Sequence, residues 1–120
     1  MDRQEWGVRL HQEPQRGDIF IADLFGDYGT RPVLVVQNNK GNQHSNTVIV
    51  VPITSRKPKD IPTHVWIPSS SGMKRPGTAK CECIYTIPQY DLRKYIGTIR
   101  GTPTEKDVNR ALKISLAIKR

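Results

Sequence analysis

Short apolar runs, separated by polar segments rich in glycine, proline and asparagine, set the pattern of this chain. Val33–Val36 and Val48–Ile53 are almost wholly apolar, which is typical of strands buried on both faces, and we expect them to pair centrally in a sheet. Pro52 predicts an edge or a bulge near the end of the second run, because proline has no N–H for the ladder. Further strands are predicted at residues 19–24, 63–67, 79–87 and 95–99.

An amphipathic helix is predicted near the C-terminus. Thr104 is the expected N-cap, and Asp107, three residues later, supplies a weaker form of the capping box. The small and apolar side chains that follow recur at the spacing of one helix face. This predicted stripe consists of Val108, Ala111, Leu112, Ser115 and Ile118.

Two other segments are less regular. Residues 38–46 are polar and are predicted to form a loop with a tight turn at 40–42. Residues 88–94 are predicted to form a short helix, because Pro88 suits a first helical position. Residues 68–80, rich in Ser, Gly, Pro and Lys, are expected to form a long loop or a short returning strand.

These elements predict a mainly β fold, a small and partly open barrel with a C-terminal helix. A chain of 120 residues suits one domain, which we expect to span residues 16–120. Residues 1–15 have no periodicity and are expected to form an N-terminal arm that Trp6 could anchor. No apolar stretch is long enough for a membrane span, and the arm has no secretory apolar core, so a cytoplasmic location is the default.

The charge balance changes the picture of what the barrel binds. The formal net charge is +8 and the isoelectric point about 9.8. This balance favours a polyanionic partner, most simply nucleic acid, although many proteins are basic for solubility alone. The basic residues are spread along the chain without a basic tail, so the fold must assemble any cationic surface.

Cysteines and histidines offer little metal chemistry. Cys81 and Cys83 project to one face of a predicted strand, where an extended backbone disfavours a disulfide between them. We interpret them as small core residues in a reducing compartment. A metal site would need two more ligands, and His11, His44 and His64 form no paired motif, so neither a metal nor another cofactor is expected.

Arg31 is the first candidate for chemistry. It lies between a glycine-containing loop and an apolar run, and Pro32 directs its backbone toward an extended conformation. The planar guanidinium of an arginine held in this way suits a phosphate group. The alternative is a surface arginine paired with Asp18 or Asp27.

A second candidate group, Thr54, Ser55 and Arg56, follows the apolar run of residues 48–53. Two hydroxyls and a cation at a strand end can stabilise the negative charge that grows on phosphate oxygens in a pentacoordinate transition state. The alternative is ordinary turn chemistry, since Ser and Thr commonly follow strands.

Glu82 and His64 are the remaining candidates. If both neighbouring cysteines face the core, Glu82 faces outward, where it could accept from a base amino group or simply be solvated or paired with an arginine. His64 has the pKa range of a general base. It shares a strand face with Trp66, however, and we favour a structural role for it.

Five segments, in their order and spacing, resemble the MazF/PemK family of toxin endoribonucleases. The resemblance runs from about residue 16 to the C-terminus, and no single motif carries it alone. The segments are Arg16–Phe20, Arg31–Asn38, Thr47–Arg56, Pro62–Val65 and Glu82–Ile87.

The resemblance implies an SH3-like barrel of the CcdB/Kid/MazF type that forms a homodimer. It implies cleavage of single-stranded messenger RNA without a metal, by attack of the 2′-OH, giving a 2′,3′-cyclic phosphate or 3′-phosphate and a 5′-OH. An acidic antitoxin protein would inhibit this activity. Arg31, in the family's G-x-R-P-V segment, and Thr54, in its I-T-S/A-x segment, correspond to catalytic residues. The expected RNA-binding residues are Gly29, Thr30, Ser55, Arg56, Arg75 and Glu82.

This chain departs from the family pattern in three places. The Phe25–Thr30 loop is shorter than the acidic G-S-E-Q-G-G loop that helps typical members to hold RNA, which affects the expected base selection. The N-terminal arm is longer than usual. In the family's E-Q-I-x-T-I segment, Cys83 replaces the glutamine.

Two alternative functions use the same fold. One is a nucleic-acid-binding barrel without catalysis, which the shortened loop would favour. The other is a CcdB-like inhibitor that poisons gyrase. Such inhibitors bind through a C-terminal tryptophan-glycine-isoleucine sequence, whereas this chain ends in Ile118-Lys119-Arg120.

Overall fold

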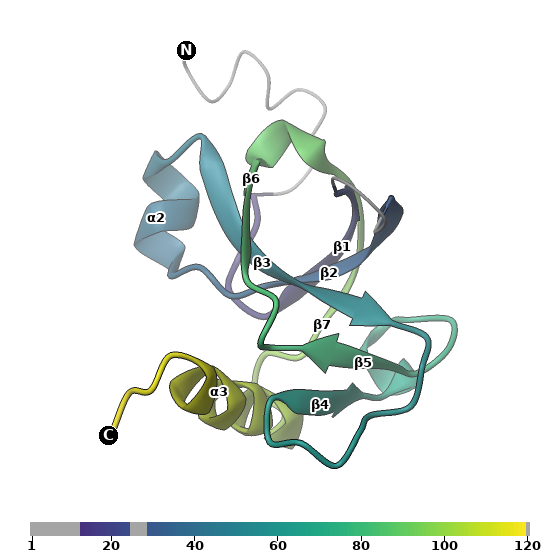
Figure 1. The fold of residues 1–120 in the computed structure, drawn as a ribbon. Helices are drawn as coiled ribbons and strands as arrows, with labels where there is room; N and C mark the ends of the chain where they lie inside the picture. The colour runs from purple at the N-terminus through teal and green to yellow at the C-terminus, as the bar shows by residue number, and fades with distance from the viewer. Residues whose placement is uncertain (1–12, 25–28, 120) are drawn as a thin grey trace.

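The computed structural model describes residues 13–24 and 29–119 (Figure 1). Two short 3-10 helices, η3 (Ser69–Ser71) and η4 (Gln89–Asp91), accompany the strands and α-helices. The strands and α-helices are β1 (Asp18–Asp23), β2 (Thr30–Val35), α2 (Asn39–His44), β3 (Thr47–Thr54), β4 (His64–Ile67), β5 (Gly77–Lys80), β6 (Tyr85–Pro88), β7 (Leu92–Thr98) and α3 (Pro103–Ser115).

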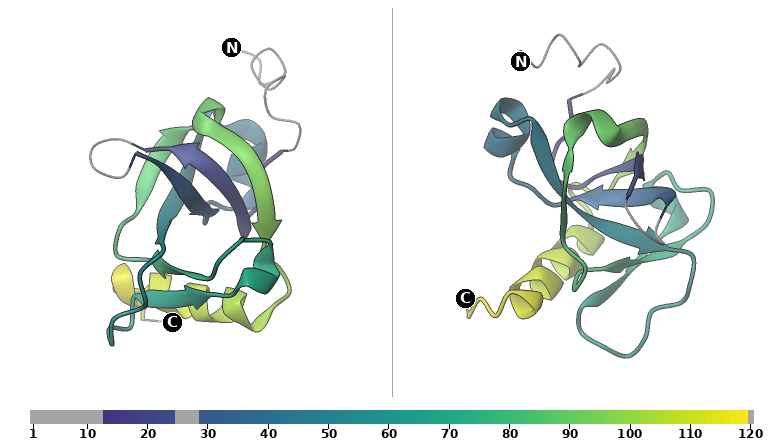
Figure 2. Two further views of the ribbon diagram at one scale, coloured as in Figure 1. Left: turned by 90° about the vertical axis from the view of Figure 1, so that its right-hand side faces the viewer. Right: turned by 45° about the horizontal axis from the view of Figure 1, so that its top comes forward.

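The strands form one antiparallel sheet of seven strands, in the order β4-β5-β3-β2-β1-β7, with β6 also paired to β3. β2 and β3 lie at its centre, with Leu34 opposite Val51, so the predicted central pair is confirmed. Figure 2 shows the sheet curled on itself, with α3 against β4. The predicted mainly β, partly open barrel with a C-terminal helix is therefore confirmed.

The neighbour of β3 changes at Pro52. The first half of β3 pairs with β6 and its last two residues, Ile53 and Thr54, pair with β5. Pro52 lies at this junction and pairs only with Val33 of β2, so the predicted sheet edge or bulge is not found, although neither β5 nor β6 pairs with Pro52. The predicted single strand over 79–87 is wrong, because it is β5, a turn and β6. The residues of the turn carry no glycine or proline, so only the two separate pairings with β3 reveal it.

Two apolar clusters form the core. Phe20, Val33 and Val50 belong to the cluster inside the curl of the sheet, and Ile53, Ile67 and Val108 to the one between the sheet and α3. In α3 the side chains of Val108, Ala111 and Leu112 are buried, which confirms the central part of the predicted stripe.

Both ends of the predicted C-terminal helix need correction. Thr104 is not the N-cap: the helix begins at Pro103 after Thr102, because proline suits a first helical position. At the other end, Ala117 adopts a φ of 57° and the helix stops at Ser115. Ser115 is therefore only partly buried and Ile118, beyond the end, is exposed.

The polar segment 38–46 contains the helix α2 rather than a loop with a tight turn. The side chain of Asn38 caps α2 by accepting from the N–H of Gly41. Asn42 is fully buried: its side-chain oxygen accepts from the Gln37 amide, its side-chain nitrogen donates to the Gln37 backbone carbonyl, and its own carbonyl accepts from the Gln89 side chain. Gln89 begins η4, the only helical turn in the predicted helix 88–94, before β7 begins at Leu92. Buried amide contacts between distant segments explain both differences.

Cys81 is buried, Cys83 is partly exposed, and no disulfide joins them. Burial raises the pKa of the Cys81 thiol to about 12, so it stays protonated at neutral pH. Glu82 between them is exposed, as predicted. Within residues 13–24 and 29–119, no helix has the length and apolar character that crossing a bilayer would require.

Candidate active site and nucleic-acid interface

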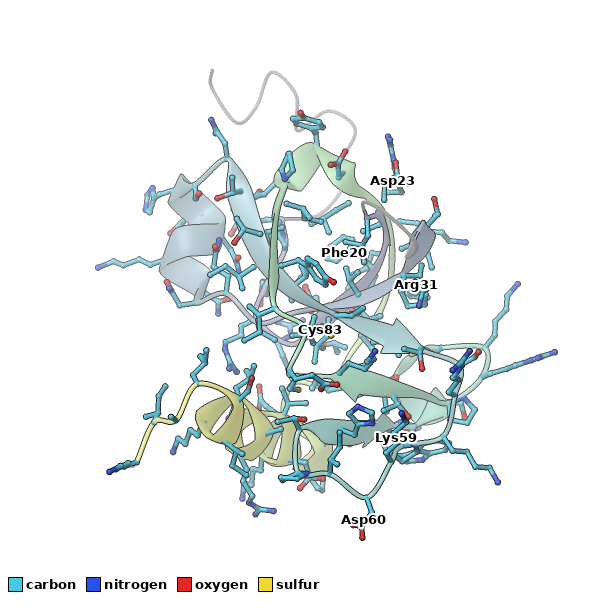
Figure 3. All side chains as sticks on the ribbon, viewed as in Figure 1. Phe20, Asp23, Arg31, Lys59, Asp60 and Cys83 are labelled. Atoms are coloured by element: carbon cyan, nitrogen blue, oxygen red, sulfur yellow. The ribbon has the colours of Figure 1, made fainter. Side chains whose placement is uncertain are left out.

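The ends of four strands enclose a cavity of about 430 Å³ that brings the two predicted catalytic residues together. Arg31 enters from β2, opposite Ala22 of β1, and Thr54 from the end of β3. Figure 3 shows Arg31 on one side of the end of β3 and Lys59 on the other. We call this space the cationic cavity; its described lining is Arg31, Thr54, Ser55, Arg56, Lys57, Lys59, Ile61, His64, Thr78, Lys80 and Glu82.

The turn that carries Thr54 is held by two hydrogen bonds. The hydroxyl oxygen of Thr54 accepts from the backbone N–H of Arg56 at 3.1 Å. The hydroxyl of Thr78, which lies opposite Thr54 in β5, donates to the carbonyl oxygen of Arg56 at 2.6 Å. The Thr54 oxygen is the acceptor in this bond, so its own hydrogen is not used in it. Thr54 is thus prepared to act as a hydrogen-bond donor.

The charge of the cavity is strongly one-sided. Five of its described lining residues are arginine or lysine and one, Glu82, is acidic. Partly enclosed surfaces of one sign concentrate ions of the opposite sign. The site is therefore suited to a phosphate or another anion rather than to a cation, and no group of three His, Cys, Asp or Glu side chains with the arrangement of metal ligands occurs in the described ranges.

Glu82 is held by His64. The Nε2 atom of His64 lies 2.9 Å from Oε2 of Glu82, and its Nδ1 atom lies 3.1 Å from the backbone nitrogen of Lys59. Burial opposes ionisation of Glu82, but hydrogen bonds from its own backbone N–H, from His64 and from Thr63 prevail and hold its pKa below the usual value. Glu82 is therefore an ionised acceptor at neutral pH.

Arg75 lies in a second cavity, of about 560 Å³, and does not line the cationic cavity. This side groove shares Thr54 and Ser55 with the first and has a mainly apolar lining with cations at its edge. Its described residues are Ile21, Pro32, Ile53, Thr54, Ser55, Met73, Lys74, Arg75, Pro76, Lys94 and Ile96. Arg31 and Arg75 thus line different cavities, which share Thr54 and Ser55.

Gly29 and Thr30 line neither cavity. The hydroxyl of Thr30 donates to Asp23 at 2.8 Å, and Asp23 also accepts from the guanidinium of Arg93 in β7. The side chains of Arg93 and Thr30 lower the pKa of Asp23. These contacts fix the base of the β1–β2 connection next to Arg31. The predicted effect of the short Phe25–Thr30 loop concerns residues 25–28, which lie outside the described residues.

Several lining residues were not identified from the sequence as members of the site. Lys57, Lys59 and Lys80 contribute to the basic composition, but only the fold places them beside Arg31. Thr78 has no local signal, since its role depends on the pairing of β5 with β3. An alternation of polar and apolar residues on a correctly delimited β5 would have placed Thr78 and Lys80 on one face.

Comparisons with known proteins agree with this fold and site. Two curated relatives are similar to the chain: the endoribonuclease EndoA of Bacillus subtilis, 40% identical over 87% of this chain and 95% of the relative, and the endoribonuclease MazF of Staphylococcus saprophyticus, 38% identical over 87% and 92%. A solved mycobacterial endoribonuclease in complex with its cognate antitoxin superposes with a TM-score of 0.78 at 32% identity, covering 89% of this chain and 98% of that one.

A family model covers most of the domain. The model of the PemK-like, MazF-like toxins of type II toxin-antitoxin systems matches residues 15–116. That range contains every described element and both candidate catalytic residues. The chain belongs to the PemK-like, MazF-like family of toxins of type II toxin-antitoxin systems.

Proposed function

We propose that the chain is a toxin endoribonuclease that cleaves single-stranded RNA without a metal ion. The observation that supports this most is that Arg31 and Thr54 line one cation-rich cavity. The curated relatives that this chain matches over almost their whole length are named endoribonucleases. The site offers hydrogen-bond donors and positive charge, which are what phosphoryl transfer requires of a protein.

The cleavage begins with attack of the 2′-OH on the adjacent phosphorus. The 2′-OH gives up its proton to water, the bond from phosphorus to the 5′-oxygen breaks, and that oxygen takes up a proton from water, which leaves a 2′,3′-cyclic phosphate and a 5′-OH. Water can then open the cyclic product to a 3′-phosphate. The pKa of arginine is above about 12, so Arg31 is a poor general base at neutral pH. Its role is to bind the phosphate oxygens through paired N–H donors as their charge grows, with Thr54 as a further donor.

The RNA extends over both sides of the end of β3. Ser55 and Arg56 lie beside Thr54 in the cationic cavity, and Arg75 lies in the side groove, which shares Thr54 and Ser55. One strand of RNA that crosses this point can therefore contact both cavities. Glu82 contacts a base in this proposal, and Gly29 and Thr30 contact the backbone next to Arg31.

An acidic antitoxin protein is the proposed inhibitor. The net charge of +8 and the cations around both cavities attract an acidic segment, and salt weakens that attraction. A homodimer is proposed as well, in the cytoplasm. The exposed apolar side chains of Ile114, Leu116 and Ile118, which are 46%, 56% and 52% exposed, offer surface for such an association. Sedimentation at tens of micromolar tests the dimer.

The direct test is incubation of the protein with a long single-stranded RNA in EDTA, followed by mapping of the new 5′ ends. Cleavage at a restricted set of sites is expected in the presence of the chelator. A protein that binds this RNA but leaves it intact would support the alternative of a binding barrel without catalysis.

A further inference from the structure

Both ring nitrogens of His64 are occupied, and together they define its tautomer. The backbone N–H of Lys59 can only donate, so Nδ1, 3.1 Å away, must accept and carries no hydrogen. Nε2 then carries the hydrogen and donates to the carboxylate of Glu82 at 2.9 Å. The imidazole is held as the neutral Nε2–H form, and its side chain is only 7% exposed.

This ring joins two walls of the cationic cavity. Through Nδ1 it holds the loop between β3 and β4, which carries Arg56, Lys57 and Lys59. Through Nε2 it holds Glu82, which follows β5. A histidine with both nitrogens bound in this way has no free lone pair to remove a proton from a substrate. Its contacts instead act on the position of another side chain.

We infer that His64 is a positioning residue for base selection: it orients Glu82 so that the site prefers RNA with an amino-bearing base beside the cleaved phosphate and disfavours uracil there. The inference rests on the proposed endoribonuclease function. A carboxylate only accepts and has about four lone-pair positions, so it can accept from a base in addition to His64. Cytosine, adenine and guanine offer amino hydrogens, whereas uracil places two carbonyl oxygens around its single N–H.

Two substitutions separate the contacts of the ring. In His64→Asn the amide oxygen reaches the position of Nδ1 and can accept from Lys59, but nothing reaches Glu82. In His64→Gln the amide nitrogen reaches the position of Nε2 and can donate to Glu82, while the contact with Lys59 is lost. The two variants thus test the two contacts one at a time.

The measurement is the ratio of cleavage rates on two RNAs that differ only in having cytosine or uracil at the base next to a mapped cut. His64→Asn should lose the preference for cytosine, a change of about 5- to 100-fold for one base contact. His64→Gln should keep that preference. Glu82→Gln should lose it as fully as His64→Asn, and the double variant should lose no more, because both act through one contact. A preference unchanged in His64→Asn, or lost equally in both His64 variants, would overturn the inference.

A second measurement does not depend on RNA cleavage. The ¹⁵N chemical shifts of the imidazole, assigned through the loss of one histidine signal in His64→Gln, report the tautomer directly. The neutral Nε2–H form is expected in the wild-type protein and in Glu82→Gln, and an Nδ1–H form would contradict the geometry. If the wild-type protein binds RNA but does not cut it, the proposed function fails and base selection with it, while the tautomer still shows whether His64 holds the two walls as inferred.

Discussion

The hydroxyl oxygen of Thr54 accepts a hydrogen bond from the backbone N–H of Arg56 at 3.1 Å, and Thr78 fixes the carbonyl of the same Arg56. These bonds orient the Thr54 hydroxyl without consuming its hydrogen. A donor that is already oriented needs no rearrangement when charge develops on a phosphate. The contact therefore links a simple turn at the end of β3 to the proposed chemistry.

The orientation of the Thr54 hydroxyl predicts how substitutions of Thr54 change the rate of RNA cleavage. Thr54→Ala should lower the rate of RNA cleavage by about 10²–10³, the usual effect of losing one such donor. Thr54→Ser, which keeps the hydroxyl, should retain most of the rate. Single-turnover cleavage of a defined RNA measures both variants, and equal rates for Ala and wild type would show that the hydroxyl takes no part.

Replacing Arg31 by lysine tests whether the positive charge of the side chain is enough or its planar pair of donors is needed. Arg31→Lys retains the positive charge but not the planar pair of donors, so cleavage should be strongly impaired while RNA binding falls less. Cleavage and filter binding of the same RNA give the two quantities. Wild-type cleavage by the lysine variant would mean that charge alone suffices.

The RNA path across both cavities predicts a change in salt dependence. Arg56→Ala and Arg75→Ala should each reduce the slope of log binding constant against log salt by about 0.7, the value for one phosphate contact on a single strand. Lys106, exposed on α3 outside both cavities, is the matched control and should leave the slope unchanged. An unchanged slope for Arg75→Ala alone would confine the RNA to the cationic cavity.

Asp18 should make the protein less stable as the pH rises above the acidic range. Its side chain is buried, and this desolvation raises its pKa above the ordinary 3.8 in spite of bonds and charge from Gln15, Arg100 and Thr98. The folded state then holds its proton more tightly than the unfolded state. Its contribution is complete below pH 3.8 and is lost as the pH rises through the higher folded value.

The comparison with Asp18→Asn isolates this contribution. Urea unfolding at a series of pH values from 3.5 upward gives the free energy of unfolding of both proteins. The difference, wild type minus variant, should decrease with rising pH across that window. A difference that grows with pH would mean that the folded state favours the charged carboxylate.

The packing of α3 on β4 predicts a large loss of stability from a single truncation. Leu112 is 9% exposed and belongs to the core cluster between the sheet and α3. Leu112→Ala should lower the free energy of unfolding by about 2–5 kcal/mol. Lys106, exposed on the same helix, is the control, and Lys106→Ala should cost about 0.5 kcal/mol or less.

The sequence pattern was sufficient to predict β2 and β3, because a continuous run of apolar residues is typical of a buried strand. It was insufficient for the strand predicted over 79–87, since β5 and β6 are separated by which half of β3 each one pairs with. It also missed α2, in which Asn42 is hydrogen-bonded to the nearby Gln37 and accepts from the side chain of the distant Gln89. Tertiary hydrogen bonds override local propensity in each case.

The candidate site divides in the same way. Arg31 and Thr54 lie at strand ends within family-like segments, so the sequence alone indicated them. Lys80 enters the cavity only through the pairing of β5, and Arg75 falls in the side groove although its residue type matches the other cations. Residue type and spacing indicate candidate side chains at strand ends, but which of these side chains line the same cavity depends on the order of the strands in the sheet.

The central claim is that Arg31 binds and stabilises the phosphate while the 2′-OH attacks it, without a metal. The most direct measurement is the chemistry of the ends made in EDTA by the wild-type protein and by Arg31→Ala, with circular dichroism to confirm that both are folded. The account predicts 5′-OH ends that a kinase labels without prior phosphatase treatment, 2′,3′-cyclic phosphates on the upstream fragments, and neither product from the folded variant. Ends that carry a 5′-phosphate, or wild-type cleavage by folded Arg31→Ala, would contradict it.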